Sequence, residues 1–382
     1  MTAPPILLTP GPLTTAPETR RAMLVDWGSW DDDFRELNQR VCRHLEAIGG
    51  GTGHVCVPMQ GCGTAAVEAA IGTLMPRSGK LLVLVNGAYG HRMVKLTATM
   101  GRAVDTYETA EDTPPDPAEL ARRLAADPAI THVGVIHCET STGILNPLDE
   151  LARVTAEAGR KLIVDAMSTF AALPIDLAWM PAAAVVASAN KCLEGVPGLG
   201  FVLCDKAELD AAKGNAHSLS LDLHDQWAYM RATGQYRYTP PTHVIAALDV
   251  AMARFEAEGG RAARLARYRD NCRHLLEGMA ELGFISLLDH VIQAPIIVTF
   301  LSPRDPNYRF ADVYRALKAR GFIIYPGKTT KVDSFRIGCI GSIGPGDMDR
   351  LVAAVASTLD ELGIADTAPA DDASSETDMV MP

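Results

Sequence analysis

The sequence predicts an α/β fold: a large domain with a mostly parallel sheet between helices, followed by a smaller C-terminal α+β domain. Between about residues 50 and 205, short apolar runs alternate with amphipathic helical stretches, a pattern typical of strands joined by crossover helices. After residue 205 this alternation stops, and residues 219–236 are richer in aromatic and polar side chains. The length of 382 residues suits two domains.

Five apolar runs are expected to form the buried strands of the large domain, at residues 81–85, 132–136, 162–164, 183–187 and 200–203. The helices expected between them cover residues 64–74, 117–126 and 147–158. In the last of these, Asp149 and Glu150 precede Arg153, the charge order that the helix dipole favours. Strands linked by helices predict parallel pairing.

The second half begins with a proline-rich loop at 238–242 and a long helical stretch at 244–282, which should break near Gly259 and Gly260. Further elements are expected at 296–300, 311–319, 322–325, 334–340 and 346–362. These patterns place an N-terminal arm at 1–20, the large domain at 21–260 and the small domain at 261–364. The acidic, aromatic-free residues 365–382 should be a disordered tail.

The composition argues against several classes of function. The net charge is −11 and no basic patch stands out, so we expect no nucleic-acid partner. No apolar run approaches the ~20 residues that a membrane helix needs, and the first twelve residues lack a secretory pattern. The eight cysteines include no CxxC pair, so we expect reduced thiols, a cytoplasmic protein and no metal site.

Two residues at the carboxyl ends of expected strands are candidates for an active site. Lys191 follows the run 183–187, and its amine could form an imine with an aldehyde if it loses its proton easily. Asp165 ends the preceding strand, 191 − 165 = 26 residues earlier, so both should lie at one edge of the sheet. Taken singly, Lys191 could be a surface lysine and Asp165 a helix N-cap. Together they favour a functional role.

A glycine-rich turn and an arginine are two further candidates. Gln60-Gly-Cys-Gly-Thr64 precedes a helix, where backbone N–H groups and the Thr64 hydroxyl could bind a phosphate. The turn matches neither the P-loop nor GxGxxG, and such a turn is often only a turn with Thr64 as its N-cap. Arg336 lies in an apolar strand, where it either faces solvent or grips a carboxylate. Alone, the solvent interpretation is favoured.

Seven motifs in order resemble the class V aminotransferases of pyridoxal-phosphate (PLP) fold type I. Each is weak alone, but the ordered set, within a likeness that runs from about residue 9 to 362, is specific. The motifs are Thr9-Pro-Gly-Pro12, Gly61-Cys-Gly-Thr64, Asn86-Gly-Ala-Tyr-Gly90, Glu139-Thr-Ser-Thr-Gly143, Val164-Asp-Ala-Met-Ser168, Ser188-Ala-Asn-Lys191 and Phe335-Arg-Ile-Gly338. The resemblance implies PLP as cofactor and transamination as the reaction.

The resemblance also implies a role for each candidate residue. Lys191 would form the imine with PLP and move the substrate proton, and Asp165 would keep the pyridine nitrogen protonated so that the ring accepts electrons. Arg336 would bind the carboxylate of pyruvate or alanine. The other implied cofactor contacts are the phosphate cradle Cys62, Gly63 and Thr64, the ring neighbour Tyr89, the hydroxyls of Thr140 and Thr142, and Thr242, which would reach the cofactor phosphate of a neighbouring subunit in a homodimer.

Further motifs resemble a group within this family that transfers an amino group from an aminophosphonate to pyruvate. They include Trp30-Asp-Asp-Asp33, Ser218-Leu-Ser-Leu-Asp-Leu223, Pro241-Thr-His243 and Tyr325-Pro-Gly-Lys328. Trp30 is expected to line the substrate pocket. Arg92, Arg336 and Lys328 are candidates to bind the phosphonate.

Three alternatives stay open at this point. An alanine– or serine–glyoxylate aminotransferase shares nearly all the cofactor residues. A cysteine desulfurase needs a mobile nucleophilic cysteine, whereas Cys339 lies in a strand-like run. A catalytically inactive scaffold would have no need for Lys191, Asp165 and Arg336 together.

Overall fold

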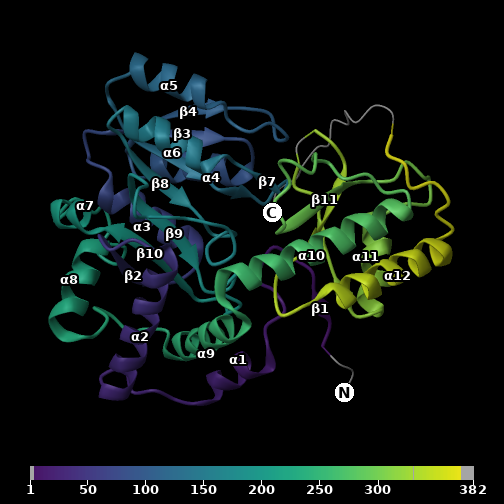
Figure 1. Ribbon diagram of the computed structural model, residues 1–382, viewed down its shortest axis with the longest axis horizontal. Helices are drawn as coiled ribbons and strands as arrows, with labels where there is room; N and C mark the ends of the chain where they lie inside the picture. Colours follow the sequence, from purple (N-terminus) through teal and green to yellow (C-terminus); the bar gives the residue numbers. More distant parts are fainter. Residues whose placement is uncertain (1–3, 330, 371–382) are drawn as a thin grey trace. The chain divides into compact units, whose positions relative to one another are not determined.

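The computed structural model describes residues 4–329 and 331–370 and divides the chain into two compact units (Figure 1). The larger unit comprises Thr15–Cys138 and Asn146–Arg264, and the smaller comprises Met1–Thr14, Glu139–Leu145 and Leu265–Pro382. The domain boundaries proposed from the sequence, after residues 20 and 260, lie close to the unit boundaries after Thr14 and Arg264. The short segment Glu139–Leu145 belongs to the smaller unit, although the sequence pattern placed it inside the large domain.

A seven-stranded sheet forms the centre of the larger unit. Its order is β2-β10-β9-β8-β5-β3-β4, and β10 alone runs antiparallel to its neighbours. The prediction of a mostly parallel sheet is therefore confirmed. The strands are β2 (His54–Gln60), β3 (Lys80–Val85), β4 (Ala103–Glu108), β5 (Ile130–Ile136), β8 (Lys161–Asp165), β9 (Ala182–Ser188) and β10 (Leu199–Asp205).

Helices cover both faces of this sheet. One face packs against α3 (Gly63–Leu74), α4 (Ala88–Thr99), α7 (Lys206–Ala211) and α8 (Leu223–Thr233). The other packs against α2 (Asp32–Gly49), α5 (Pro117–Ala126), α6 (Leu148–Glu157) and α9 (Thr242–Glu258), while α1 (Pro17–Arg21) and η1 (Ala22–Leu24) contact α9. In β10, Phe201 and Leu203 join the α2 side, and Val202 and Cys204 join the α3 side. This period of two explains why the strands are apolar throughout.

The smaller unit contains a three-stranded antiparallel sheet of order β11-β14-β13, formed by Ile297–Leu301, Ser334–Gly338 and Tyr325–Pro326. β1 (Ile6–Leu7) pairs in parallel with β12 (Phe322–Ile323), and β6 (Cys138–Glu139) pairs with β7 (Ile144–Leu145). Phe300 and Phe335 stack with their ring centroids 5.6 Å apart, inside a core shared with α10 (Gly260–Glu281), α11 (Phe310–Ala319) and α12 (Pro345–Leu362). The predicted α+β character is confirmed.

The structure tests two expectations, the break in the long helical stretch and the tail that begins at residue 365. The long helical stretch divides as expected, because α9 ends at Glu258 and Gly259 adopts a φ of 111° at its C-cap. Residues 365–370, assigned above to a disordered tail, are held in the structure: the Thr367 hydroxyl donates to the Leu282 carbonyl at 2.7 Å. Residues 371–382 lie outside the described part of the chain.

None of the helices within residues 4–329 and 331–370 is long and apolar enough to cross a membrane.

Candidate functional site

The carboxyl ends of the parallel strands meet at one edge of the large sheet, and four connections there carry predicted site residues. The β2–α3 turn carries Cys62 and Gly63, and Tyr89 lies in the first turn of α4, which follows β3. Asp165 is the last residue of β8, and Lys191 lies three residues beyond the end of β9. Open α/β sheets bind ligands at this edge. The expectation that Asp165 and Lys191 share one edge therefore agrees with the topology.

Asp165 is held at the end of its strand by hydrogen bonds on both sides. The residue is 8% exposed, and its Oδ1 accepts the N–H of Met167 at 2.9 Å. Its carbonyl accepts the N–H of His137 at 2.9 Å. Asp165 therefore closes a strand-to-turn junction rather than capping a helix.

His137 is a neighbour of Asp165 that the sequence analysis did not single out. Its Nδ1 lies 3.0 Å from the Thr169 hydroxyl, and burial lowers the pKa of its ring to about 4. The ring is therefore neutral near pH 7 and adds no positive charge beside the carboxylate. Its position directly after a predicted strand was the signal that could have identified it.

Lys191 is half-buried in a turn that is tied to the Asp165 segment. The carbonyl of Lys191 accepts the N–H of Glu194 at 2.8 Å, and the next thiol, Cys192, donates to the Ser168 carbonyl at 3.1 Å. Ser168 lies three residues after Asp165. The lysine and the carboxylate therefore sit on two connections that are joined directly to each other.

The glycine-rich turn opens α3 beside the same segment. A Cβ on Gly63 would lie 2.4 Å from Sδ of Met167, so close packing favours glycine at this position. Cys62 occupies the N-cap position and is exposed, whereas Thr64 is the second residue of the helix. The interpretation of Thr64 as the N-cap is therefore wrong by two positions.

Thr64, Tyr89 and Arg92 form a group that joins α3 to α4. Nη1 of Arg92 donates to the Thr64 hydroxyl at 3.4 Å, and the Arg92 guanidinium lies 4.8 Å from the Tyr89 ring centroid. A guanidinium, a hydroxyl and a helix N-terminus are all groups that bind phosphate-like anions. This side of the turn therefore has the chemistry of an anion site.

Arg336 is buried in the smaller unit, not exposed on an edge strand. It lies in the central strand β14, paired with Thr299 on one side and Tyr325 on the other, and is 5% exposed. Its Nε donates to the Pro326 carbonyl at 3.0 Å and its Nη1 to the Thr140 carbonyl at 2.7 Å. The solvent-facing interpretation, favoured by the strand alone, is wrong because the residue is 5% exposed and its guanidinium donates to two backbone carbonyls.

Thr140 and Thr142 belong to the segment that contacts Arg336. Both side chains are buried, and the Thr142 carbonyl accepts the Thr299 hydroxyl at 2.7 Å. Gly143, at a φ of 100°, allows the close approach, since a Cβ there would lie 2.4 Å from the Ile297 carbonyl oxygen. The structure thus brings Thr140 and Arg336 together within one unit.

Thr242 and Trp30 lie on helix-starting segments of the larger unit. Thr242 is the first residue of α9, and its hydroxyl lies 3.5 Å from Nδ1 of His243. Nε2 of His243 is 3.1 Å from a carboxylate oxygen of Asp26. Trp30 is 75% exposed and packs against the Arg35 guanidinium, 5.9 Å from its ring centroid. Neither residue lies in one of the four connections described above.

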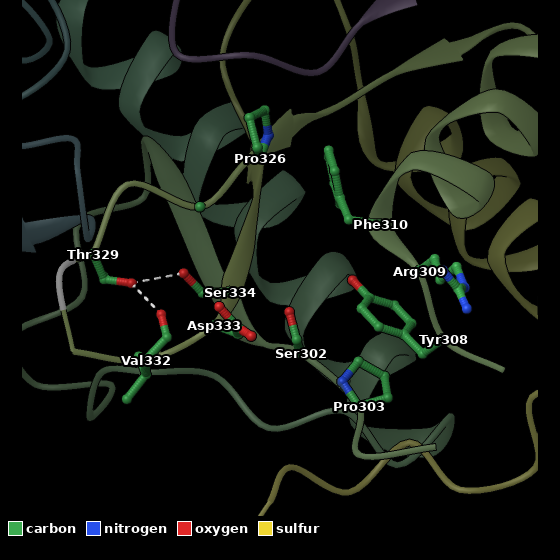
Figure 2. A pocket seen from close by; sticks show the side chains of 11 residues that line it. Ser302, Pro303, Tyr308, Arg309, Phe310, Pro326, Thr329, Val332, Asp333 and Ser334 are labelled. Atoms are coloured by element: carbon green, nitrogen blue, oxygen red, sulfur yellow. Dashed lines mark hydrogen bonds between the residues drawn. The ribbon is translucent and has the colours of Figure 1, made fainter. Parts of the chain in front are cut away.

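A separate pocket of about 430 Å³ lies in the smaller unit (Figure 2). Tyr308 and Phe310 line it on one side, and Asp333 with Ser334 on another. Burial raises the pKa of Tyr308 to about 12, so its hydroxyl stays protonated. Pro326, whose carbonyl accepts Arg336, also lines the pocket, whereas none of the predicted site residues does.

Among the described residues, one group could in principle share a metal ion: Asp222, His224 and Asp225. Its polar atoms are already used, because Asp222 caps α8 by accepting the N–H of Asp225 at 3.0 Å. The Arg237 guanidinium lies 3.9 Å from the Asp225 carboxylate and supplies positive charge there. The group is accounted for as a helix cap with an ion pair.

Comparison with known proteins adds an independent observation. Residues 54–337 match the sequence profile of the family described as Aminotransferase class-V. A 2-aminoethylphosphonate--pyruvate transaminase of Pseudomonas entomophila is 59% identical over 367 residues, which cover 96% of this chain and all of that protein. The enzyme of the same name from Pseudomonas aeruginosa is 59% identical over 361 residues, or 94% of this chain and 97% of that protein.

Solved structures share the fold over nearly the whole chain. An alanine--glyoxylate aminotransferase from Nostoc superposes with a TM-score of 0.87 at 23% identity, covering 94% of this chain and 96% of that one. A pyridoxamine-pyruvate aminotransferase from Mesorhizobium loti gives a TM-score of 0.86 at 24% identity, covering 95% and 94%. At this level of identity the likeness concerns the fold alone.

Proposed function

Since the chain belongs to the class V aminotransferase family, we propose that it is a PLP-dependent transaminase that converts 2-aminoethylphosphonate and pyruvate to phosphonoacetaldehyde and L-alanine. The observation that carries this proposal is the 59% identity, over 96% of the chain, to transaminases of that name. Lys191, Asp165 and Arg336 are all present, as a working enzyme of this kind requires.

The residues at the sheet edge fit PLP. A half-buried amine, a buried carboxylate and a helix N-terminus that carries the Thr64 hydroxyl match the cofactor's aldehyde, pyridine nitrogen and phosphate. We assign these contacts to Lys191, to Asp165, and to Cys62, Gly63 and Thr64. Tyr89 is assigned to the ring, and the hydroxyls of Thr140 and Thr142 are assigned to the cofactor ring or its phenolic oxygen.

When bound, PLP supplies an electron sink for the carbanion that forms at the substrate carbon. The freed amine of Lys191 would take the proton from that carbon as a general base and deliver it to the C4′ carbon of the cofactor as a general acid, the exchange that converts an amine into a carbonyl. Asp165 keeps a negative charge beside the pyridine nitrogen and so holds a proton there. The neutral ring of His137 leaves that charge undiminished.

The amino donor sets a particular demand on the site. 2-Aminoethylphosphonate has no carboxylate next to its amine, so its orientation must come from the phosphonate. Binding energy from that remote group should therefore raise the rate as well as the affinity. We assign the phosphonate to Arg92, Arg336 and Lys328 as candidates, with Trp30 at the substrate pocket, and the pyruvate carboxylate to Arg336.

The proposals for assembly and compartment are supported by surface and cysteine chemistry. We propose a homodimer in which Thr242 serves the partner's cofactor phosphate. Large apolar side chains are exposed in and just after η1, with Leu24 at 83% and Val25 at 53%, and η1 packs on α9. The eight cysteines are free thiols, which suits the cytoplasm, a reducing compartment.

The desulfurase alternative fits the structure poorly. Cys339 is fully buried just after β14, and a hydrogen bond with Cys272 together with burial raises the pKa of its thiol. A protonated, buried thiol is a poor nucleophile. The glyoxylate aminotransferase remains the second candidate, since a homologous fold accommodates it.

The test is a set of specificity constants. With pyruvate as acceptor, the specificity constant of 2-aminoethylphosphonate should exceed that of beta-alanine by at least about 100-fold, because a planar carboxylate carries less charge than a phosphonate dianion. L-serine and L-alanine are compared as donors to glyoxylate. Lys191→Ala, assayed alongside, sets the background rate. A higher constant for L-serine or L-alanine with glyoxylate would replace this proposal with the glyoxylate enzyme.

A further inference from the structure

A fully buried arginine lies behind the turn that carries Lys191. Arg264, in the first turns of α10, is 1% exposed, and its Nη1 donates to the carbonyl of Cys192, the residue after Lys191. Its Nε and Nη2 each lie 2.8 Å from the Glu258 carboxylate. A buried guanidinium is stable only when its donors are bonded and its charge is compensated.

A second carboxylate comes from the turn itself. Nη1 of Arg264 lies 3.6 Å from the carboxylate of Glu194, which is 6% exposed. One guanidinium therefore contacts the turn twice, through the Cys192 carbonyl and through the Glu194 side chain. The planar fork of arginine suits this arrangement, whereas an ammonium group cannot reach both partners in fixed directions.

The backbone of the turn is constrained at Glu194. Its φ is 59°, a left-handed backbone conformation that residues other than glycine rarely adopt. The next residue is constrained too, since a Cβ on Gly195 would lie 2.9 Å from the Ala189 carbonyl oxygen. Such conformations persist where surrounding contacts fix them, and they cluster at functional sites.

We propose that Arg264 and Glu194 are positioning residues that fix the turn from Ala189 to Gly195 and so hold Nζ of Lys191 at the reacting carbon. The inference rests on the proposed role of Lys191. Through its bond to the Cys192 carbonyl, Arg264 acts on the backbone of the turn. The Cys192 thiol, bonded to the Ser168 carbonyl, extends the same frame to the segment of Asp165.

The experiment compares Arg264→Lys, Glu194→Gln and Glu194→Ala as holoenzymes. Misplacement of a reacting group by about 1 Å lowers rates roughly 100-fold. We therefore expect kcat to fall about 10- to 100-fold in Arg264→Lys and Glu194→Ala, with the KM values of both substrates changed less than about two-fold. Glu194→Gln keeps the shape of the side chain, and its kcat should lie between Glu194→Ala and the wild type.

A second readout is independent of turnover. Visible absorbance of the bound cofactor should be lost faster during dialysis in Arg264→Lys than in the wild type, because a displaced lysine attaches the cofactor less well. Arg102→Met is the matched control: Arg102 is 7% exposed and donates to the carbonyls of Gly72, Met75 and Asn215, away from the lysine turn. It should lower the melting temperature and leave kcat and cofactor retention near wild type.

The outcomes separate two failures. The wild-type protein should show a visible absorbance that borohydride abolishes and that Lys191→Ala lacks. If it shows no such absorbance, the proposed function fails. If that signal is present but the Arg264 and Glu194 variants lower only the melting temperature, as Arg102→Met does, the positioning role is overturned.

Discussion

Two N–H groups of Arg336 are bonded to backbone carbonyls within its own unit. Those carbonyls belong to Pro326, on the neighbouring β13, and to Thr140, on a segment almost two hundred residues earlier. Both bonds fix the plane of the guanidinium before any ligand arrives. Preorganised donors of this kind lose little entropy when they bind a carboxylate.

Arg336→Lys should therefore lower the specificity constant for pyruvate more than the specificity constant for the amino donor. Loss of a bidentate charged contact costs about 1.5–3 kcal/mol, which corresponds to about 10- to 150-fold in the specificity constant for pyruvate. Single-turnover measurements of the two half-reactions test this. Arg315→Lys, on the exposed face of α11, serves as a control for the chemistry of the exchange. Equal losses in both half-reactions would contradict a role specific to pyruvate and would mean that Arg336 also binds the phosphonate or acts mainly on the fold.

Strand β5 and the residue after it place two histidines in the interior. Burial lowers the pKa of His132 and of His137 to about 4, with the charge of Lys161 adding to the effect on His132. The folded chain therefore holds neutral rings, whereas the unfolded chain takes up protons below about pH 6.5. The stabilising contribution is fully present above that pH and is lost as pH falls towards 4.

We expect the free energy of unfolding to fall between pH 6.5 and 4, by up to about 3 kcal/mol for each histidine. Urea unfolding at a series of pH values measures this, and His132→Gln should make the dependence shallower. His290→Gln is the control, because the His290 side chain is 86% exposed. A slope that is unchanged in His132→Gln would show that this ring does not titrate with folding.

At the level of the whole molecule, the strands buried on both faces were predictable because they are continuous apolar runs. Strand β2 was missed because it contains Pro58 and polar ends, and the edge strand β4 because most of its side chains are exposed or half-buried. The common edge of Asp165 and Lys191 followed from parallel topology. The Arg264–Glu194 pair did not, since its members are 264 − 194 = 70 residues apart and meet only through packing.

The homodimer is testable through the exposed apolar residues beside α9. Leu24→Asp should shift the protein towards monomer in light scattering, because a charge is unfavourable at the apolar centre of an interface. Cofactor retention should fall with it, and also in Thr242→Val, which removes a hydroxyl without adding charge. Val291→Asp, at a side chain 78% exposed in the smaller unit, is the control. A fully active monomer would contradict the shared site.

The antiparallel strand β10 has a consequence for biosynthesis. β2 lies at the sheet edge and pairs with β10 alone, with Gln60 opposite Leu199, 139 residues later. β3, β4 and β5 can pair soon after they leave the ribosome. β2 cannot pair until β10, which ends at Asp205, has been synthesised. At about 5–20 residues per second, that delay is roughly 7 to 30 seconds. During this delay the turn at Cys62 and Gly63 has no fixed position. A nascent chain that stops short of β10 should therefore be unable to bind the cofactor's phosphate. It should also expose β2 as an unpaired strand to neighbouring chains.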